Sequence, residues 1–111
     1  ILGHRYSGLR IRYWENGQRS AWILNEIGKE QPITFGIVIE ADKIKHVKVL
    51  AFRESRGWEI RHPAFTQQFK DATLIDNALD RHIDGVSGAT LSVWAMTAVT
   101  RLALYLDTLI T

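Results

Sequence analysis

The residues best suited to chemistry lie in one short stretch, Asp84 to Thr90, which reads Asp-Gly-Val-Ser-Gly-Ala-Thr. Its two glycines allow a tight turn and a close approach of the backbone to a ligand. Ser87 and Thr90 place two hydroxyls at the start of residues 91–109, the only long segment with helical periodicity. Unpaired N–H groups and the positive end of a helix dipole favour a bound phosphate at such a place.

Two readings of this stretch stay open on its chemistry alone. It lacks the lysine of the phosphate-binding loop G-x-x-x-x-G-K-[ST], and it lacks the three-glycine pattern of dinucleotide sites. The pattern is therefore also typical of a helix N-terminus that a serine or threonine caps.

The string D-G-x-S-G-A-T closely resembles the flavinylation motif of the FMN-binding domain family. That domain occurs in the C subunit of the sodium-translocating NADH:quinone oxidoreductase and in the G subunit of the Rnf electron-transport complex. The resemblance implies that Thr90 carries FMN through a phosphoester bond to its side-chain oxygen. The other cofactor-binding residues that it implies here are Ser87, Gly88, Ala89 and Leu91 at the phosphate and ribityl end, together with Asp84 and Gly85. Asp84 has two open roles, as a ligand of the Mg²⁺ used in the attachment reaction or as a cap of the turn.

A second candidate segment, residues 53–61, packs charges around a glycine and a tryptophan. The matching loop of the family often reads Glu-Thr-Pro-Gly, whereas this chain has Glu-Ser-Arg-Gly at 54–57, with arginine in place of proline. We expect the flavin to lie between the threonine turn and this loop, where Glu54, Ser55, Gly57 and Trp58 would approach it. Trp58 either stacks on the isoalloxazine or packs half-buried. The arginines are read as surface charges in preference to groups that stabilise a reduced flavin: Arg53, Arg56 and Arg61.

Alternating hydrophobicity predicts the strands that carry these segments. Asn16–Gly17 lies between two alternating runs over residues 10–24, which predicts a hairpin with a type I′ turn. A second pair of strands is expected at 33–40 and 44–52, with a strict period of two. The residues expected to share the apolar faces are Ile33, Phe35, Ile37 and Ile39 in the first strand and Val47, Val49 and Ala51 in the second.

The helices follow the strands. Pro63 suits the first turn of a short helix, with Phe65 and Phe69 on one side, and Asp76–Asn77 suggests a turn. The apolar stripe predicted for the final helix consists of Leu91, Trp94, Ala95, Ala98, Leu102, Tyr105, Leu106 and Leu109, widened by Val93, Met96, Val99 and Ala103. We therefore expect a single α+β domain over residues 1–111, with residues 1–9 as a lead-in. An antiparallel sheet of consecutive hairpins carries the short helix and the long C-terminal helix on one face.

Composition excludes several classes of function. The net charge is only +2, with 14 basic and 12 acidic residues, which argues against nucleic-acid binding. Lys43, Lys45, His46 and Lys48 read as the solvated face of a strand. Cysteine is absent and the four histidines lack ligand spacing, so no metal site is expected. No apolar run approaches the length of about 18 residues of a membrane span, so any membrane association is expected to come from segments outside this sequence.

The function implied by the resemblance is that of an electron-transfer flavoprotein module with covalent FMN. No triad or carboxylate pair argues for an independent enzyme. The implied partners are an FMN transferase, which uses FAD and Mg²⁺, and redox partners such as cytochromes or membrane dehydrogenase subunits. The implied location is the bacterial periplasm or cell envelope. The alternatives are a flavin-bearing sensory or regulatory ectodomain of a membrane protein and a small flavin-dependent reductase.

Overall fold

The computed structural model describes residues 12–27, 31–53, 58–76, 78–85 and 89–110, so the expected lead-in at 1–9 lies outside the described residues. Four antiparallel strands form one sheet in the order β1-β2-β3-β4. Their bounds are Arg12–Asn16 for β1, Arg19–Ile27 for β2, Pro32–Glu40 for β3 and Lys43–Ala51 for β4. This sheet of consecutive hairpins confirms the predicted fold class.

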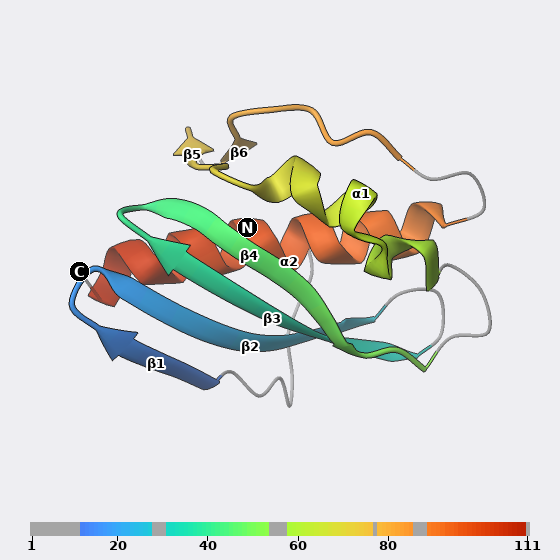
Figure 1. Cartoon of the computed structure of the whole chain (residues 1–111), viewed down its shortest axis with the longest axis horizontal. Coiled ribbons are helices and arrows are strands. Elements are labelled where there is room, and N and C mark those ends of the chain that lie inside the picture. The colour runs from blue at the N-terminus through green and yellow to red at the C-terminus, as the bar shows by residue number, and fades with distance from the viewer. Residues whose placement is uncertain (1–11, 28–30, 54–57, 77, 86–88, 111) are drawn as a thin grey trace.

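The remaining elements follow β4 in the chain. A 3₁₀ turn at Trp58–Arg61 leads into the short helix α1, Pro63–Thr66, and a second 3₁₀ turn, Gln67–Phe69. A small hairpin of β5, Leu74–Ile75, and β6, Ala78–Leu79, precedes the long helix α2, Thr90–Ile110. Figure 1 shows α2 lying across one face of the sheet, with α1 and the small hairpin beyond the β4 edge. No helix of the described residues is long and apolar enough to cross a membrane.

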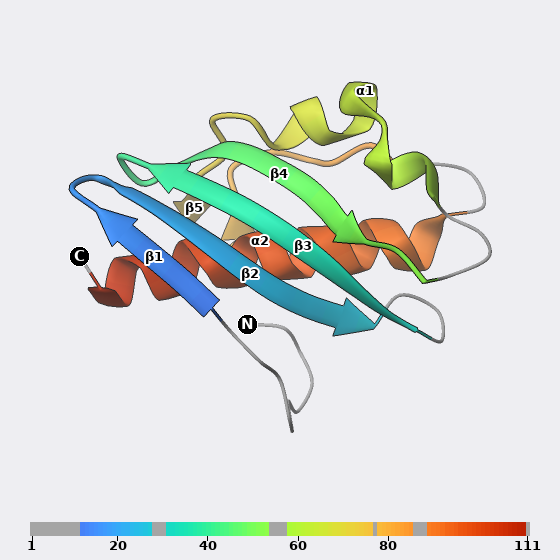
Figure 2. The ribbon, with the colours of Figure 1, turned by 60° about the horizontal axis from the view of Figure 1, so that its bottom comes forward.

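The core lies between the sheet and α2. The buried residues of β3 alternate with partly exposed ones, as the period-two pattern predicts, and they are Ile33, Phe35, Ile37 and Ile39. Trp22 and Leu24 extend this apolar face across β2. In the turned view of Figure 2, the face of the sheet opposite α2 carries no described helix. One face is thus buried while the other carries partly exposed residues.

The first hairpin forms as predicted, but its turn lies one residue later. Asn16 pairs with Arg19, so the two loop residues are Gly17 and Gln18 rather than Asn16 and Gly17. Gly17 takes a φ of +62°, and Gln18 is not among the described residues with positive φ. A type I′ turn needs positive φ at both central residues, whereas glycine at the first position alone serves the related two-residue hairpin turn. The predicted type I′ turn is therefore wrong.

A β-bulge also interrupts the predicted alternation of β4. The register shifts between Val38 and Ile39 of β3, which pair with His46 and Ile44 of β4. Ile44 and Val47 consequently both face the core although they are three residues apart. The N–H of Ile44 donates to the carbonyl of Ala72 at 2.9 Å, and its carbonyl accepts from Asp71 N–H at 2.7 Å. The bulge thus lies where the chain at 71–72 joins the edge of the sheet.

The long helix is confirmed, but the side that it buries differs from the predicted stripe. Trp94 is 66% exposed and Leu109 is 64% exposed. Of the predicted stripe, Ala95 is buried. The other buried residues of the helix are the four expected only to widen the stripe, Leu104 and three polar residues: Val93, Met96, Val99, Ala103, Leu104, Ser92, Thr100 and Asp107. Apolar residues surround this helix on nearly every side, so period alone does not identify the buried side. Contact with β2 and β3 decides it.

The segment between the sheet and α2 folds largely as expected. Pro63 begins α1, and the Phe65 and Phe69 rings meet edge to face with centroids 5.8 Å apart. Asp76 takes a φ of 53° in the turn of the small hairpin, while Asn77 lies outside the described residues. The hairpin strands β5 and β6 were not predicted, because two-residue strands are too short for alternation to reveal.

Candidate functional site

Thr90 is the first residue of α2, and its side chain is exposed. The carbonyl of Ala89 accepts a hydrogen bond from Val93 N–H at 2.9 Å, so Ala89, which is 3% exposed, holds the capping position. Alanine has no side-chain oxygen with which to cap the helix. Within the described residues, Thr90 Oγ1 has no hydrogen-bond partner. The hydroxyl is therefore accessible, and Thr90 is not the residue at the cap.

The first turn of α2 is also favourable for an anion. It contains no acidic residue. The leading N–H groups of any α-helix lack intrahelical acceptors and carry the positive end of its dipole. A phosphate joined to Thr90 would therefore lie at the electropositive end of a helix of 21 residues.

A cavity of about 620 Å³ lies beside Thr90. One wall is a face of α2 and the other is the segment 78–85. The helix contributes Thr90, Val93, Trp94, Thr97, Ala98 and Arg101, and the facing segment contributes Ala78, Leu79, Arg81, His82, Ile83 and Gly85. This volume falls in the range of about 300–1,000 Å³ that is typical of sites for small molecules and cofactors.

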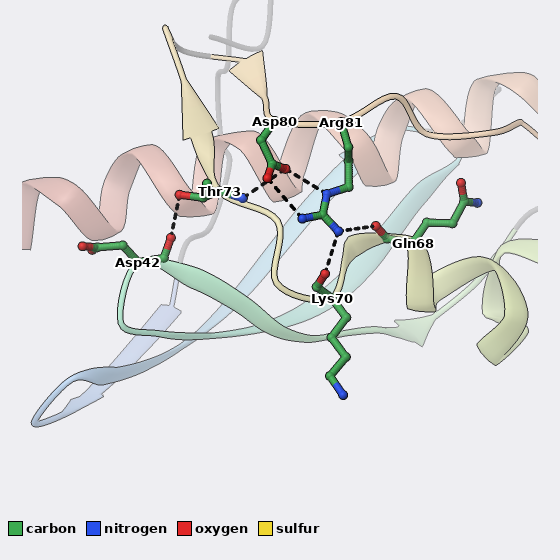
Figure 3. A network of polar contacts seen from close by, with 6 residues as sticks. All are labelled: Asp42, Gln68, Lys70, Thr73, Asp80 and Arg81. Atoms are coloured by element: carbon green, nitrogen blue, oxygen red, sulfur yellow. Dashed lines mark hydrogen bonds and ion pairs between the residues drawn. The ribbon is translucent and has the colours of Figure 1, made fainter.

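A polar network holds the facing segment in place (Figure 3). Arg81 forms a two-point ion pair with Asp80, at 2.8 Å from Nε to Oδ1 and 3.1 Å from Nη2 to Oδ2. Its Nη1 also donates to the Lys70 carbonyl at 2.8 Å. The paired guanidinium lowers the pKa of Asp80, and Asp80 raises the pKa of Arg81. The positive charge of Arg81 is thus engaged by Asp80, although Arg81 lines the cavity.

The same network reaches the sheet through Thr73. The backbone N–H of Asp80 donates to the Thr73 carbonyl at 2.9 Å, and the Thr73 hydroxyl donates to the Asp42 carbonyl at 2.9 Å. Asp42 lies in the turn between β3 and β4 with a φ of 65°. These bonds join the small hairpin to the turn between β3 and β4 at the end of the sheet.

The beginning of the threonine motif is held by Gln68, in the 3₁₀ turn that follows α1. The Gln68 side chain bonds both the N–H and the carbonyl of Asp84. The Asp84 carboxylate itself points outward and lies 3.7 Å from His82 Nε2, with both side chains almost fully exposed. A Cβ added at Gly85 would meet nothing within 4 Å. The two roles predicted for Asp84 remain predictions.

The other predicted site residues fall into two groups. Ser87, Gly88, Glu54, Ser55 and Gly57 lie outside the described residues, as does Arg56. Leu91 is exposed beside Thr90, and Ala89 is buried. Trp58 is 60% exposed and does not line the cavity that Thr90 lines. Arg53 and Arg61 are exposed, and Arg53 donates to the Pro32 carbonyl at 2.8 Å.

Five cavity residues on α2 were missed from the sequence, among them Val93 and Ala98. The other three are Trp94, Thr97 and Arg101. They follow Thr90 at intervals of 4, 7 and 11 residues. Helical geometry places residues with this spacing on one face. The signal was therefore present once Thr90 was identified, but Trp94 was assigned to the buried stripe. Segment 78–85 offered no such periodic signal.

The arrangement suits a ligand that combines a phosphate with a flat ring system. The phosphate would lie at the N-terminus of α2, and the ring would lie along the cavity against apolar and aromatic side chains. Within the described part of the chain, no three His, Cys, Asp or Glu residues are grouped as metal ligands would be.

Comparison with known proteins shows a family match. Residues 28–105 match the family defined as the FMN-binding domain. The matched range includes β3, β4, the cavity wall at 78–85 and Thr90 with most of α2. No curated protein and no solved structure matches the chain.

Proposed function

Because the chain belongs to the FMN-binding domain family, with residues 28–105 matched, we propose that it is an electron-transfer module that carries FMN esterified to Thr90. The observation that carries the proposal is the position of Thr90 within the matched range. Thr90 is the first residue of α2 and lines a cavity of about 620 Å³. Its hydroxyl is exposed and has no hydrogen-bond partner among the described residues.

In the attachment step, FAD donates its FMN group to Thr90. Thr90 Oγ1 forms a bond to the phosphorus that bears the riboflavin moiety. The bond from that phosphorus to the bridging oxygen breaks, and AMP leaves with the electron pair. The hydroxyl proton passes to the transferase or to water. An exposed threonine suits this reaction, since the modifying enzyme must reach its oxygen.

After attachment, each part of the site has a separate task. Bound FMN supplies one- and two-electron transfer chemistry. The N–H groups at the start of α2 favour the phosphodiester anion, and the cavity walls restrict the volume that the ring can occupy. A covalent tether suits a relay, because the carrier is not lost when one redox partner leaves and another arrives.

The partners and the location are part of the same proposal. The attachment needs a Mg²⁺-dependent FMN transferase, and a relay needs an electron donor and an acceptor, such as cytochromes or membrane dehydrogenase subunits. We place the module in the bacterial periplasm or cell envelope. These three statements follow from the resemblance of the motif at 84–90 to the flavinylation motif of the family.

The direct test compares two threonines of the same helix face. The chain, Thr90→Ala and Thr97→Ala are each produced together with an FMN transferase and analysed by mass spectrometry under denaturing conditions. Thr97 lines the same cavity, but its hydroxyl donates to the Val93 carbonyl at 2.8 Å, which makes it a matched control. We expect the FMN adduct on the parent and on Thr97→Ala, and none on Thr90→Ala. An adduct that persists on Thr90→Ala would refute attachment at Thr90.

A small flavin-dependent reductase is the second candidate, and the size of the cavity favours it. Such an enzyme would oxidise a nicotinamide or similar donor and reduce a small acceptor at steady state. The flavinylated protein should be reduced by a donor in a single turnover in either case. Sustained turnover with purified small acceptors alone would favour the reductase over the relay.

A further inference from the structure

We propose that Trp94 and Arg101 hold the isoalloxazine ring along α2, in the cavity between this helix and segment 78–85. This inference rests on the proposed function, because it concerns the FMN joined to Thr90. It differs from the sequence-based expectation, which placed the flavin against the Glu54–Trp58 loop.

Trp94 lies on the cavity wall close to Thr90. It follows Thr90 by one helical turn, about 6 Å along the axis at a rise of 1.5 Å per residue. Both residues line the cavity, and Trp94 leaves two thirds of its surface open, at 66% exposed. A large aromatic side chain exposed on the wall of a cavity offers a flat surface on which another ring system can stack.

The cavity wall opposite Trp94 contains aliphatic side chains. Leu79 and Ile83 are half-buried, pack against the hydrophobic core and line the cavity. The Asp80–Arg81 ion pair lies between them in the chain and ties this wall to the Lys70 carbonyl (Figure 3). The wall is therefore held in place, and apolar surface faces Trp94 across the cavity. A slot between an indole and aliphatic side chains suits a flat, largely apolar ring.

Arg101 marks the far end of the same helix face. It follows Thr90 by 11 residues, about 16 Å along the axis. Its guanidinium is always charged, and the residue lines the cavity. Arg101 is partly buried, which strengthens its interaction with a nearby negative charge relative to a fully exposed cation. It would therefore favour the extra electron density that the ring accepts on reduction.

Two exposed tryptophans allow a matched test of the ring position. Trp94→Ala and Trp58→Ala are prepared with FMN attached, and the adduct is measured by mass spectrometry before any spectroscopy. Both changes remove exposed indoles, at 66% and 60%, so both variants are expected to fold. Because a stacked indole quenches flavin emission, we expect Trp94→Ala to raise flavin fluorescence several-fold and to alter visible circular dichroism. Trp58→Ala should leave both signals unchanged.

Arg101 is tested by the reduction potential of the attached flavin. Arg101→Gln should lower the midpoint potential, and Arg101→Lys, which keeps the positive charge, should restore most of it. An approximately tenfold loss of preference for the reduced form would correspond to a shift of about 30 mV in a two-electron couple. Arg19→Gln is the control, since Arg19 of β2 is paired with Glu40 of β3 and neither residue lines the cavity.

The outcomes separate this inference from the function on which it rests. An adduct on all variants, with fluorescence altered by Trp58→Ala and not by Trp94→Ala, would overturn the ring position while leaving covalent FMN intact. Equal potentials in the parent and Arg101→Gln would overturn the role of Arg101. Absence of the adduct from the parent in the presence of active transferase would overturn the proposed function, and this inference with it.

Discussion

The side-chain amide of Gln68 bonds both backbone groups of Asp84. Its Oε1 accepts the Asp84 N–H at 2.7 Å, and its Nε2 donates to the Asp84 carbonyl at 3.1 Å. Gln68 lies in the 3₁₀ turn after α1, and Asp84 begins the threonine motif. One side chain therefore joins two segments that are separated by 16 residues and sets where the motif leaves the cavity wall.

Gln68→Ala should loosen this junction. Two hydrogen bonds are lost, each worth about 0.5–1.5 kcal/mol net, and exposure favours the lower part of that range. We expect the free energy of unfolding in urea to fall by about 1–2 kcal/mol. FMN transfer to Thr90 should also slow, because the motif is less well positioned. Gln67→Ala is the matched control, since its exposed side chain forms no hydrogen bond among the described residues. Equal transfer rates in both variants would contradict the positioning role of Gln68.

The Asp80–Arg81 pair should make stability depend on pH in acid. The hydrogen bonds from Arg81 lower the pKa of Asp80 in the folded protein. A carboxyl whose pKa is lower in the folded state contributes stability above its unfolded pKa, which is about 3.9, and loses it as pH falls through the folded value. Asp80→Asn should therefore be less stable than the parent at neutral pH, and the difference should shrink below about pH 4.

Urea titrations of the parent and Asp80→Asn at neutral pH and below about pH 4 check this prediction. Asp76→Asn is the control, since Asp76 is exposed in the turn between β5 and β6 and asparagine accepts its positive φ of 53°. A stability difference between Asp80→Asn and the parent that stays constant from neutral to acid pH would argue against the ion pair as its source.

Ser20→Ala should destabilise the contact between β2 and the end of α2. The Ser20 hydroxyl donates to Asp107 Oδ1 at 2.5 Å and accepts from Trp22 Nε1 at 2.8 Å. All three groups are buried, so the change removes a partner from a buried carboxylate and from a buried indole. We expect a cost of about 1–3 kcal/mol in denaturant unfolding. Thr108→Ala, at an exposed position of the same helix, should change stability by less than about 0.5 kcal/mol.

Gly36→Ala tests the packing of the uncovered sheet face. A Cβ at Gly36 would lie 3.1 Å from Leu50 Cδ1, and Leu50 is half-exposed and able to move. Glycine within a strand costs about 0.5–1 kcal/mol relative to alanine, so we expect a small gain in stability. In a Leu50→Ala background the gain should increase, because the neighbouring side chain no longer has to move. Thermal unfolding of the four variants of this cycle gives the coupling directly.

Much of the fold was predictable because its strands are regular. Period two over residues 33–40 identified β3 and its buried face, and the glycine at 17 signalled the first hairpin. The position of the turn and the bulge at Ile44 were not predictable, because each depends on a difference of a single residue in the register of cross-strand pairing. The small hairpin β5–β6 depends on hydrogen bonds to Asp42 and Lys70, distant in the chain.

By itself, the sequence determined the family and the candidate anchor, since the motif ending at Thr90 depends on local residue types and the match covers residues 28–105. Only the tertiary structure decided what faces that threonine. α2 is apolar on nearly every side, so its packing against the sheet determined that Val93 and Met96 are buried while Trp94 is exposed. The Arg81 and Gln68 bonds then place segment 78–85 opposite Trp94. Such long-range contacts leave no periodic signal in either segment, which is why the cavity could not be derived from the sequence.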